Sequence, residues 1–172
     1  MRCCLGALLA AVVLSGAARA DEADAVKLVD KLGGKIVRDE KQPDKPVVEV
    51  DLAGTMVTDA SLKELKVLKQ LTTLYLNGTE VTDAGLKELK DLKQLTDLDL
   101  TNTKVTDLGV KELKELMQLT RLMLSDTQVT DTGLKDLKEL KQLTTLNLHF
   151  AKVTDAGVKE LQEALPKCKI SR

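Results

Sequence analysis

The chain has 172 residues, of which 43% are hydrophobic, 31% are charged and only 1% are aromatic. Its 26 basic and 27 acidic side chains give a formal net charge of −1, which offers no positive surface to nucleic acid or anionic lipid. One Tyr, one Phe and no Trp exclude an aromatic platform that stacks bases or sugars. We therefore expect one globular domain with an aliphatic core and no nucleic-acid partner.

Residues 1–20 are predicted to form a secretory signal peptide. Arg2 precedes an apolar run over residues 5–14, and the segment closes with the small-x-small sequence Ala18-Arg19-Ala20. The apolar run is shorter than the roughly 20 residues that span a bilayer, so we expect cleavage after Ala20 rather than a membrane anchor. The mature protein is then exported to the periplasm or the medium, with no membrane span.

The cysteine count limits the chemistry that the mature chain can support. Cys3 and Cys4 lie in the predicted signal, so only Cys168 remains and no intrachain disulfide is expected. One Cys and one His cannot assemble a zinc site, and we expect no metal and no cofactor. In an oxidising compartment, Cys168 could instead join two chains into a dimer.

Residues 21–46 are predicted to cap the N-terminal end of the fold. The sequence DEADAVKLVDKLGG has apolar residues at helical spacing, and it predicts a helix that stops at Gly33-Gly34. Next come KIVRD, a turn with Pro43 and Pro46, and VVEVDL, which together predict a hairpin of two strands. The first of these strands belongs to the cap.

Residues 47–165 contain a 24-residue repeat. The sequence VTD opens each unit, at Val57, Val81, Val105, Val129 and Val153, and the segment before Val57 matches the end of a unit. A fixed period this short is typical of a solenoid. In LTDLDL, Leu98 and Leu100 alternate with Asp97 and Asp99, as in a strand with one buried face.

The other half of each unit predicts a short amphipathic helix. Leu86, Leu89 and Leu92 recur every third residue between charged residues, and Thr82 or Asp83 suits the helix N-cap. Charges of opposite sign at i and i+4, such as Lys87 and Asp91, predict ion pairs along the helix. Because strand and helix alternate, the strands must lie parallel and in register. We expect an α/β solenoid with strands on its concave face and helices on its convex face.

Residues 166–172 are predicted to form a C-terminal capping strand after Pro166 has ended the last helix. Thr55, Thr79, Thr103 and Thr127 follow the strands, and we expect their hydroxyls to bond the backbone of the neighbouring loop.

The repeated pattern LxxLxLxxTxVTDxGLxxL resembles the leucine-rich repeat, most closely the cysteine-containing subtype familiar from F-box proteins. Thr stands where that subtype has a loop Cys, and no F-box precedes the repeats. The chain is also similar to short exported bacterial leucine-rich repeat proteins. The resemblance implies a right-handed horseshoe segment that binds a partner through its concave face, and a chain that is not an enzyme.

The exposed strand positions and the loops after them vary between units, whereas the core positions scarcely change. The only Tyr, Phe and His of the chain lie there. Tyr, Met, Arg and Phe are residue types that dominate binding energy at interfaces. The candidate contact residues are Tyr75, Asp99, Arg121, Met123, Asn147, His149 and Phe150. The expected partner is an unidentified protein or an envelope component.

Three competing hypotheses stay open at this point. The variation is equally consistent with drift in a structural spacer or envelope component that has no specific ligand. A remote alternative is a hydrolase, because Ser125 and His149 occupy the same position in adjacent units and Asp126 is next to Ser125. Asp51, Asp97 and Asp99 could attract calcium weakly, although three solvated carboxylates are the simpler interpretation.

Overall fold

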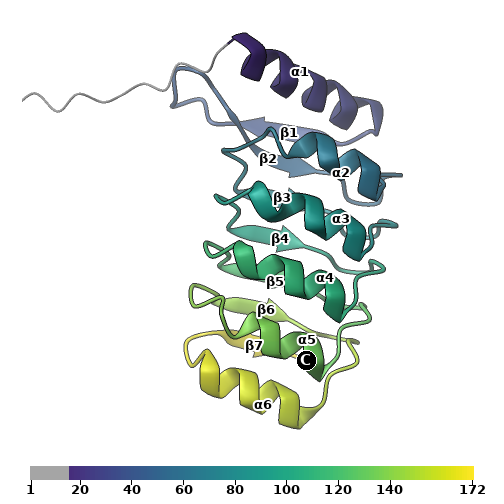
Figure 1. The fold of residues 1–172 in the computed structure, drawn as a ribbon, viewed down its shortest axis with the longest axis vertical. Helices are drawn as coiled ribbons and strands as arrows, with labels where there is room; N and C mark the ends of the chain where they lie inside the picture. The colour runs from purple at the N-terminus through teal and green to yellow at the C-terminus, as the bar shows by residue number, and fades with distance from the viewer. Residues whose placement is uncertain (1–15) are drawn as a thin grey trace, which may run out of the picture.

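The computed structural model describes residues 16–172, with side chains from residue 21 onward. Figure 1 shows helices stacked on one side of the molecule and strands on the other. The elements are α1 (Gly16–Lys31), β1 (Lys35–Arg38), β2 (Val47–Asp51), α2 (Asp59–Leu65), β3 (Thr73–Tyr75), α3 (Asp83–Glu88), η1 (Leu89–Asp91), β4 (Asp97–Asp99), α4 (Asp107–Glu112), η2 (Leu113–Glu115), β5 (Arg121–Met123), α5 (Asp131–Leu137), β6 (Thr145–Asn147), α6 (Asp155–Ala164) and β7 (Lys169–Ser171). The first 15 residues of the predicted signal peptide lie outside the described part, and α1 runs through its predicted cleavage point at Ala20.

One seven-stranded sheet runs the length of the molecule in chain order. β1 pairs antiparallel with β2, and every later strand pairs parallel with the one before it. The register places each residue beside its equivalent 24 positions on, so that Leu74, Leu98, Leu122 and Leu146 form one buried row. This register confirms the predicted α/β solenoid.

The core lies between the sheet and the helices. Each coil contributes strand leucines such as Leu98 and Leu100 and helix leucines such as Leu86 and Leu89, all at most 1% exposed. A single coil cannot exclude water from these side chains, so the packing of coil on coil supplies the stability. The helices lie on the convex side and leave the opposite face of the sheet open (Figure 1).

The helices are shorter than the sequence pattern suggests. α3 ends at Glu88 and continues as the 3-10 turn η1, whose 3.0-residue period matches leucines spaced three apart. The predicted i, i+4 ion pairs, such as Lys87 with Asp91, were wrong, since none is among the ion pairs of the described residues. Within the described residues, ion pairs instead join successive coils, as between Lys93 and Glu115 and between Lys138 and Glu160.

The loop threonines also differ from expectation. The hydroxyl of Thr79 donates to the carbonyl of Leu76, three residues earlier in the same coil, at 2.6 Å. Thr103 and Thr127 repeat this bond, each at 2.7 Å. The prediction that these hydroxyls bond the neighbouring loop was wrong. They close the turn after their own strand, where a carbonyl would otherwise be buried without a partner.

Contacts between successive helix N-termini join the coils on the convex side. Thr106 caps α4, and its backbone N–H and hydroxyl both donate to the carboxylate of Asp83 in the previous coil, at 2.8 and 2.7 Å. The same two bonds recur at each junction, and we call this series the Asp–Thr ladder. Its pairs are Asp59 with Thr82, Asp83 with Thr106, Asp107 with Thr130, and Asp131 with Thr154.

Glycine leaves the space that this ladder needs. A Cβ added to Gly109 would lie within 3.0 Å of an Asp83 carboxylate oxygen, and Gly85, Gly133 and Gly157 meet the preceding Asp in the same way. The first unit has Ser61 at this position. The residue 26 positions earlier, where the later units have the preceding Asp, is Lys35 in β1. The larger side chain therefore stands where no carboxylate precedes it.

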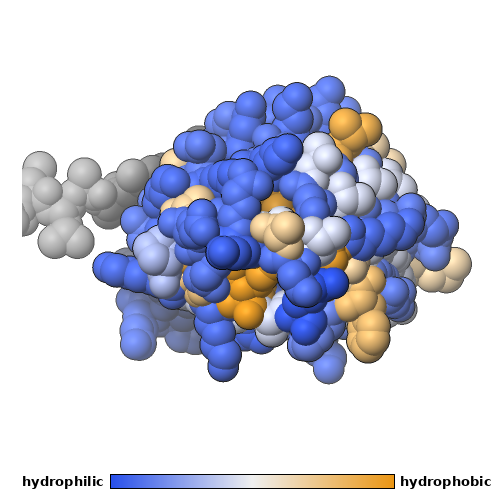
Figure 2. Space-filling model, turned by 90° about the horizontal axis from the view of Figure 1, so that it is seen from below, coloured by the Kyte–Doolittle hydropathy of each residue, from blue (hydrophilic) through white to orange (hydrophobic). Residues whose placement is uncertain are grey.

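The apolar core is covered to different extents at the two ends of the solenoid. At the N-terminal end, α1 buries Ala25 and Val29 against the first coil. At the C-terminal end, Val158 and Ile170 are only partly buried, although their equivalents in earlier coils are enclosed. Figure 2 views the molecule from this end and shows apolar surface among hydrophilic side chains.

Candidate functional site

The open face of the sheet carries two rows of exposed or half-buried side chains, because residues on either side of each buried leucine point away from the core. The strand pairing sets the order within each row. One row is Glu49, Thr73, Asp97, Arg121, Thr145 and Lys169, and the other is Asp51, Tyr75, Asp99, Met123, Asn147 and Ser171. We call this surface the concave face.

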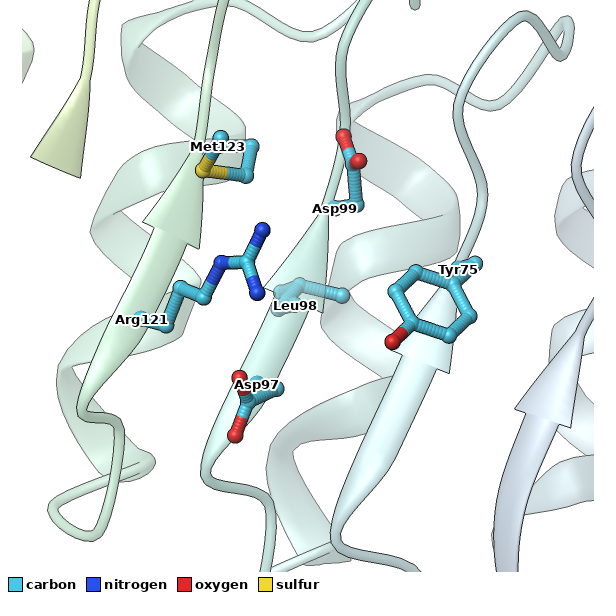
Figure 3. A pocket seen from close by; sticks show the side chains of 6 residues that line it. All are labelled: Tyr75, Asp97, Leu98, Asp99, Arg121 and Met123. Carbon is cyan, nitrogen blue, oxygen red and sulfur yellow. The ribbon is translucent and has the colours of Figure 1, made fainter. Parts of the chain in front are cut away.

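A shallow, open pocket lies on this face across β3, β4 and β5. It encloses about 180 Å³ of non-protein space, part of which is open solvent. Six residues line it, namely Tyr75, Asp97, Leu98, Asp99, Arg121 and Met123 (Figure 3). Four of the seven candidate contact residues thus share one site. Asp97 was not among the candidates, although its place in an exposed row of the repeat marks it.

The pocket combines an aromatic ring with charges of both signs. In Figure 3 the guanidinium of Arg121 extends from β5 toward β4, with Asp97 on one side and Asp99 on the other. Partial burial raises the pKa of Tyr75 above its ordinary value of 10.0, and the negative charge of Glu49 raises it further. The positive charge of Arg121 acts in the opposite direction. The Tyr75 phenol therefore stays neutral at physiological pH.

The other three candidates lie outside this pocket. Asn147 is on β6, and its side-chain oxygen accepts the backbone N–H of His149 at 3.1 Å. His149 and Phe150 are exposed in the following loop, with ring centroids 6.3 Å apart. Asp99 makes the corresponding bond to Thr101 at 2.9 Å, so Asp99 and Asn147 each have a structural role in shaping a loop.

Phe150 has an unusual backbone conformation for so large a residue. Its φ is 61°, in the left-handed region, and its side chain is 86% exposed. The equivalent residues in the other coils are Gly54, Gly78, Asn102 and Asp126, all with positive φ. Gly, Asn and Asp tolerate this region, whereas a bulky residue there is strained. Strain at an exposed residue is a recurrent property of functional positions.

The proposed Ser125–His149 pair does not form a hydrolytic site. Ser125 is only 8% exposed, and its hydroxyl is buried without a hydrogen-bond partner. His149 is exposed, and no hydrogen bond joins it to Ser125 within the described residues. The hydrolase alternative was therefore wrong, because a nucleophile must reach both its base and its substrate.

Cys168 is 4% exposed in the last coil, and burial raises the pKa of its thiol. The sulfur is thus shielded from a second chain, which argues against the predicted dimer through Cys168. No cluster of three or more His, Cys, Asp or Glu side chains in the described part could hold a metal ion. Among the helices described, none combines the length and apolar character needed to cross a membrane.

Comparisons with known proteins identify the class. A solenoid of parallel strands and short helices defines a repeat protein, and two family models match its units. The model for two copies of leucine-rich repeats matches residues 69–115, and a single-repeat model matches residues 116–138 and 141–161. The chain belongs to the leucine-rich repeat proteins. Proteins of this class are typically non-enzymatic interaction modules, and we assign this chain no enzymatic activity.

Solved structures agree with this assignment. An internalin (inlF) from Listeria monocytogenes is 27% identical over 72% of this chain and 34% of its own, with a TM-score of 0.62. A leucine-rich repeat protein of Leptospira interrogans is 31% identical over 64% of this chain and 27% of its own, with a TM-score of 0.54. The chain thus spans about a third of these proteins.

The ectodomain of the receptor kinase SOBIR1 from Arabidopsis thaliana shares the fold over 88% of this chain and 90% of its own, with a TM-score of 0.56 at 15% identity. No curated protein sequence matches the chain.

Proposed function

We propose that this protein is an exported protein-binding module that recognises its partner through the concave face and the adjoining loop at His149 and Phe150. The observation that carries the proposal is the convergence of unusual side chains on that surface. The only Tyr of the chain lines a pocket there, and the only Phe is 86% exposed in the loop after β6. Such aromatic residues supply most of the energy at protein interfaces.

The convex face carries charges of both signs. Its basic residues, such as Lys87 and Lys111, lie beside acidic ones, such as Glu88 and Glu112, so their fields largely cancel. Leu108 and Met117 are exposed there, at 69% and 49%, but neither lines the pocket. These two residues provide a matched control for the concave face.

Export is a second part of the proposal. It rests on the signal-like sequence of residues 1–20, with cleavage after Ala20, and on similarity to an internalin. Assignment to the cysteine-containing subtype, with Thr in place of Cys, rests on the repeat pattern. The domain limits that we propose are 1–20, 21–46, 47–165 and 166–172.

The test compares two triple variants as bait in envelope and medium fractions of the producing cell. One carries Tyr75→Ala, Met123→Ala and Phe150→Ala on the proposed surface. The other carries Met56→Ala, Leu108→Ala and Met117→Ala, which removes apolar side chains that are at least 49% exposed and lie outside the two rows of the concave face. We expect a partner that the parent and the control both retain and the concave variant loses.

Urea unfolding of each variant establishes that its fold is intact. If all three baits retain the same proteins, or none retains any, the concave face is not a binding surface. The spacer alternative would then explain the chain better.

A further inference from the structure

Four carboxylates surround Tyr75 on the concave face. The strand register places Asp51 and Asp99 directly beside Tyr75, and Glu49 and Asp97 beside its neighbour Thr73. Adjacent strands are about 4.8 Å apart, so each carboxylate is within reach of a group bound over the ring. We call Glu49, Asp51, Asp97 and Asp99 the acidic zone.

The acidic zone keeps an excess of negative charge, because its four carboxylates have two bases beside them in the sheet. None of its carboxylates takes part in an ion pair within the described residues. Its nearest bases in the sheet are Lys35, opposite Asp51 on β1, and Arg121, beside Asp97 on β5. On β2, β3 and β4 the exposed rows contain four acids, Thr73 and Tyr75, and no base.

The position of Arg121 shows that the pocket accommodates a cationic side chain. Its guanidinium reaches the edge of β4 between Asp97 and Asp99, and it points toward Leu98 and the Tyr75 side of the pocket (Figure 3). A cation from the protein therefore occupies one side of the acidic zone, whereas the Glu49 and Asp51 side has none on its own strand.

We propose that the partner presents a cationic segment to the acidic zone, with a Lys or Arg side chain over the ring of Tyr75. This inference rests on the proposed function of the concave face and names its partner's chemistry. The aromatic ring attracts the cation and covers its aliphatic stem, and the carboxylates balance its charge. Arg121 then competes with the incoming cation rather than pairing with an acidic group of the partner.

Tyr75 itself provides the reporter, because the chain has one Tyr and no Trp. The full chain is titrated with a blocked peptide of alternating lysine and glycine, and with a matched peptide of glutamate and glycine. Binding is followed by tyrosine fluorescence and calorimetry at low and high salt.

Two double variants separate a local effect from a change in net charge. Asp97→Asn with Asp99→Asn neutralises half of the acidic zone, and Asn at position 99 keeps the loop bond that Asn147 already makes. Glu64→Gln with Asp91→Asn changes the net charge equally at exposed residues on the helix side.

The proposal predicts that the lysine peptide binds the parent and the Glu64/Asp91 variant alike. It predicts roughly fivefold or more weaker binding to the Asp97/Asp99 variant and weaker binding at high salt. Arg121→Gln should bind the lysine peptide more tightly than the parent does.

Three results would overturn it: equal binding by the two double variants, tighter binding of the glutamate peptide, or loss of lysine-peptide binding in Arg121→Gln. None of these contradicts concave-face binding, which the capture experiment with the Tyr75, Met123 and Phe150 variant tests separately. A failure of that capture experiment, by contrast, removes the proposed function whatever the peptides do.

Discussion

Three residues from two successive coils depend on one another at each junction of the solenoid. The carboxylate of Asp83 accepts both donors of Thr106, and Gly109 leaves the room that this carboxylate occupies. Each residue type alone has an ordinary explanation, since Thr caps helices and Gly permits close approach. In this contact Asp accepts the hydrogen bonds, Thr donates them and Gly leaves space for the carboxylate. Ser61 replaces Gly only in the first unit, where no Asp lies 26 positions earlier.

Gly109→Ala should therefore destabilise the protein, although Ala is the better helix former by about 1 kcal/mol. We expect a loss of about 1–3 kcal/mol in the free energy of unfolding by urea, because the added Cβ collides with Asp83. Ser61→Ala serves as the control and should change stability by less than about 0.5 kcal/mol. In an Asp83→Ala background, the penalty of Gly109→Ala should shrink. If the double variant lost as much stability as the two single variants together, the carboxylate would not be the group that the added Cβ meets.

Phe150 provides a second prediction at this scale. Phe150→Asn should raise the free energy of unfolding by about 1 kcal/mol, because Asn tolerates a φ of 61° and little buried surface is lost. Phe150→Ala keeps the left-handed penalty and should bring no such gain. If Phe150→Asn unfolds at a lower urea concentration than the parent, then Phe150 stabilises the fold, and its positive φ does not reduce stability.

The exposure of single side chains was predictable only in part from the sequence. Alternation along each strand identifies Tyr75, Arg121 and Met123 as outward-facing, and the 24-residue register brings them together. Ser125 is buried, although alternation predicts an exposed side chain two residues after the outward-facing Met123. The sequence pattern did not predict the Asp–Thr ladder. Its partners are 23 positions apart, and each of them is also explained as a helix-capping residue.

At the scale of elements, helices α2 to α6 have 6 to 10 residues, so they are too short to be stable alone and are held by contacts with neighbouring coils. Isolated helices shorter than about 12 residues are marginal in water. The period-3 leucines were predicted to form one amphipathic helix, and the 3-10 end of α3 shows how that spacing is accommodated. The Asp–Thr ladder ties each helix N-terminus from α3 to α6 to the N-terminus of the helix before it.

The last junction predicts an acid-sensitive contact. Hydrogen bonds from the Thr154 hydroxyl and backbone N–H hold the pKa of Asp131 below its ordinary value of 3.8. A lowered pKa in the folded state means that this stabilisation is present above the unfolded value and is lost as the pH falls through the folded one.

Asp131→Asn should consequently lose less stability than the parent between neutral pH and about pH 3, measured by urea midpoints. Asp136→Asn is the control on the same helix, since it removes no hydrogen bond of the described structure. Equal acid sensitivity in Asp131→Asn and the parent would contradict a role for this carboxylate.

For the whole molecule, the unequal ends decide where opening begins. α1 covers the first coil, whereas the last coil leaves Val158 and Ile170 partly exposed. In a solenoid, each coil is held chiefly by its neighbours, so the coil with one neighbour opens most easily. Cys168 lies in that coil and is buried, which makes its thiol a local probe of the C-terminal end.

We expect Cys168 to react slowly with a thiol reagent in the native protein and quickly in urea, because burial shields the sulfur and raises its pKa. Peptide mapping separates it from Cys3 and Cys4. Native labelling that begins at lower urea than the loss of helical circular dichroism would show the last coil opening first. Labelling as fast in buffer as in urea would mean that the last coil does not close over the thiol.

The contact between Asp, Thr and Gly also determines how the chain could be lengthened. Consider a copy of residues 83–106 inserted after Thr106. The original Asp83 would face the Gly85 of the copy, and the Asp83 of the copy would face Gly109. Every carboxylate would thus keep its Thr donor and the space that Gly leaves. A copy of the first unit placed inside the array would bring Ser61 against an Asp. The units are therefore similar in sequence but not interchangeable, and an array of this type grows by duplicating internal coils between its two ends.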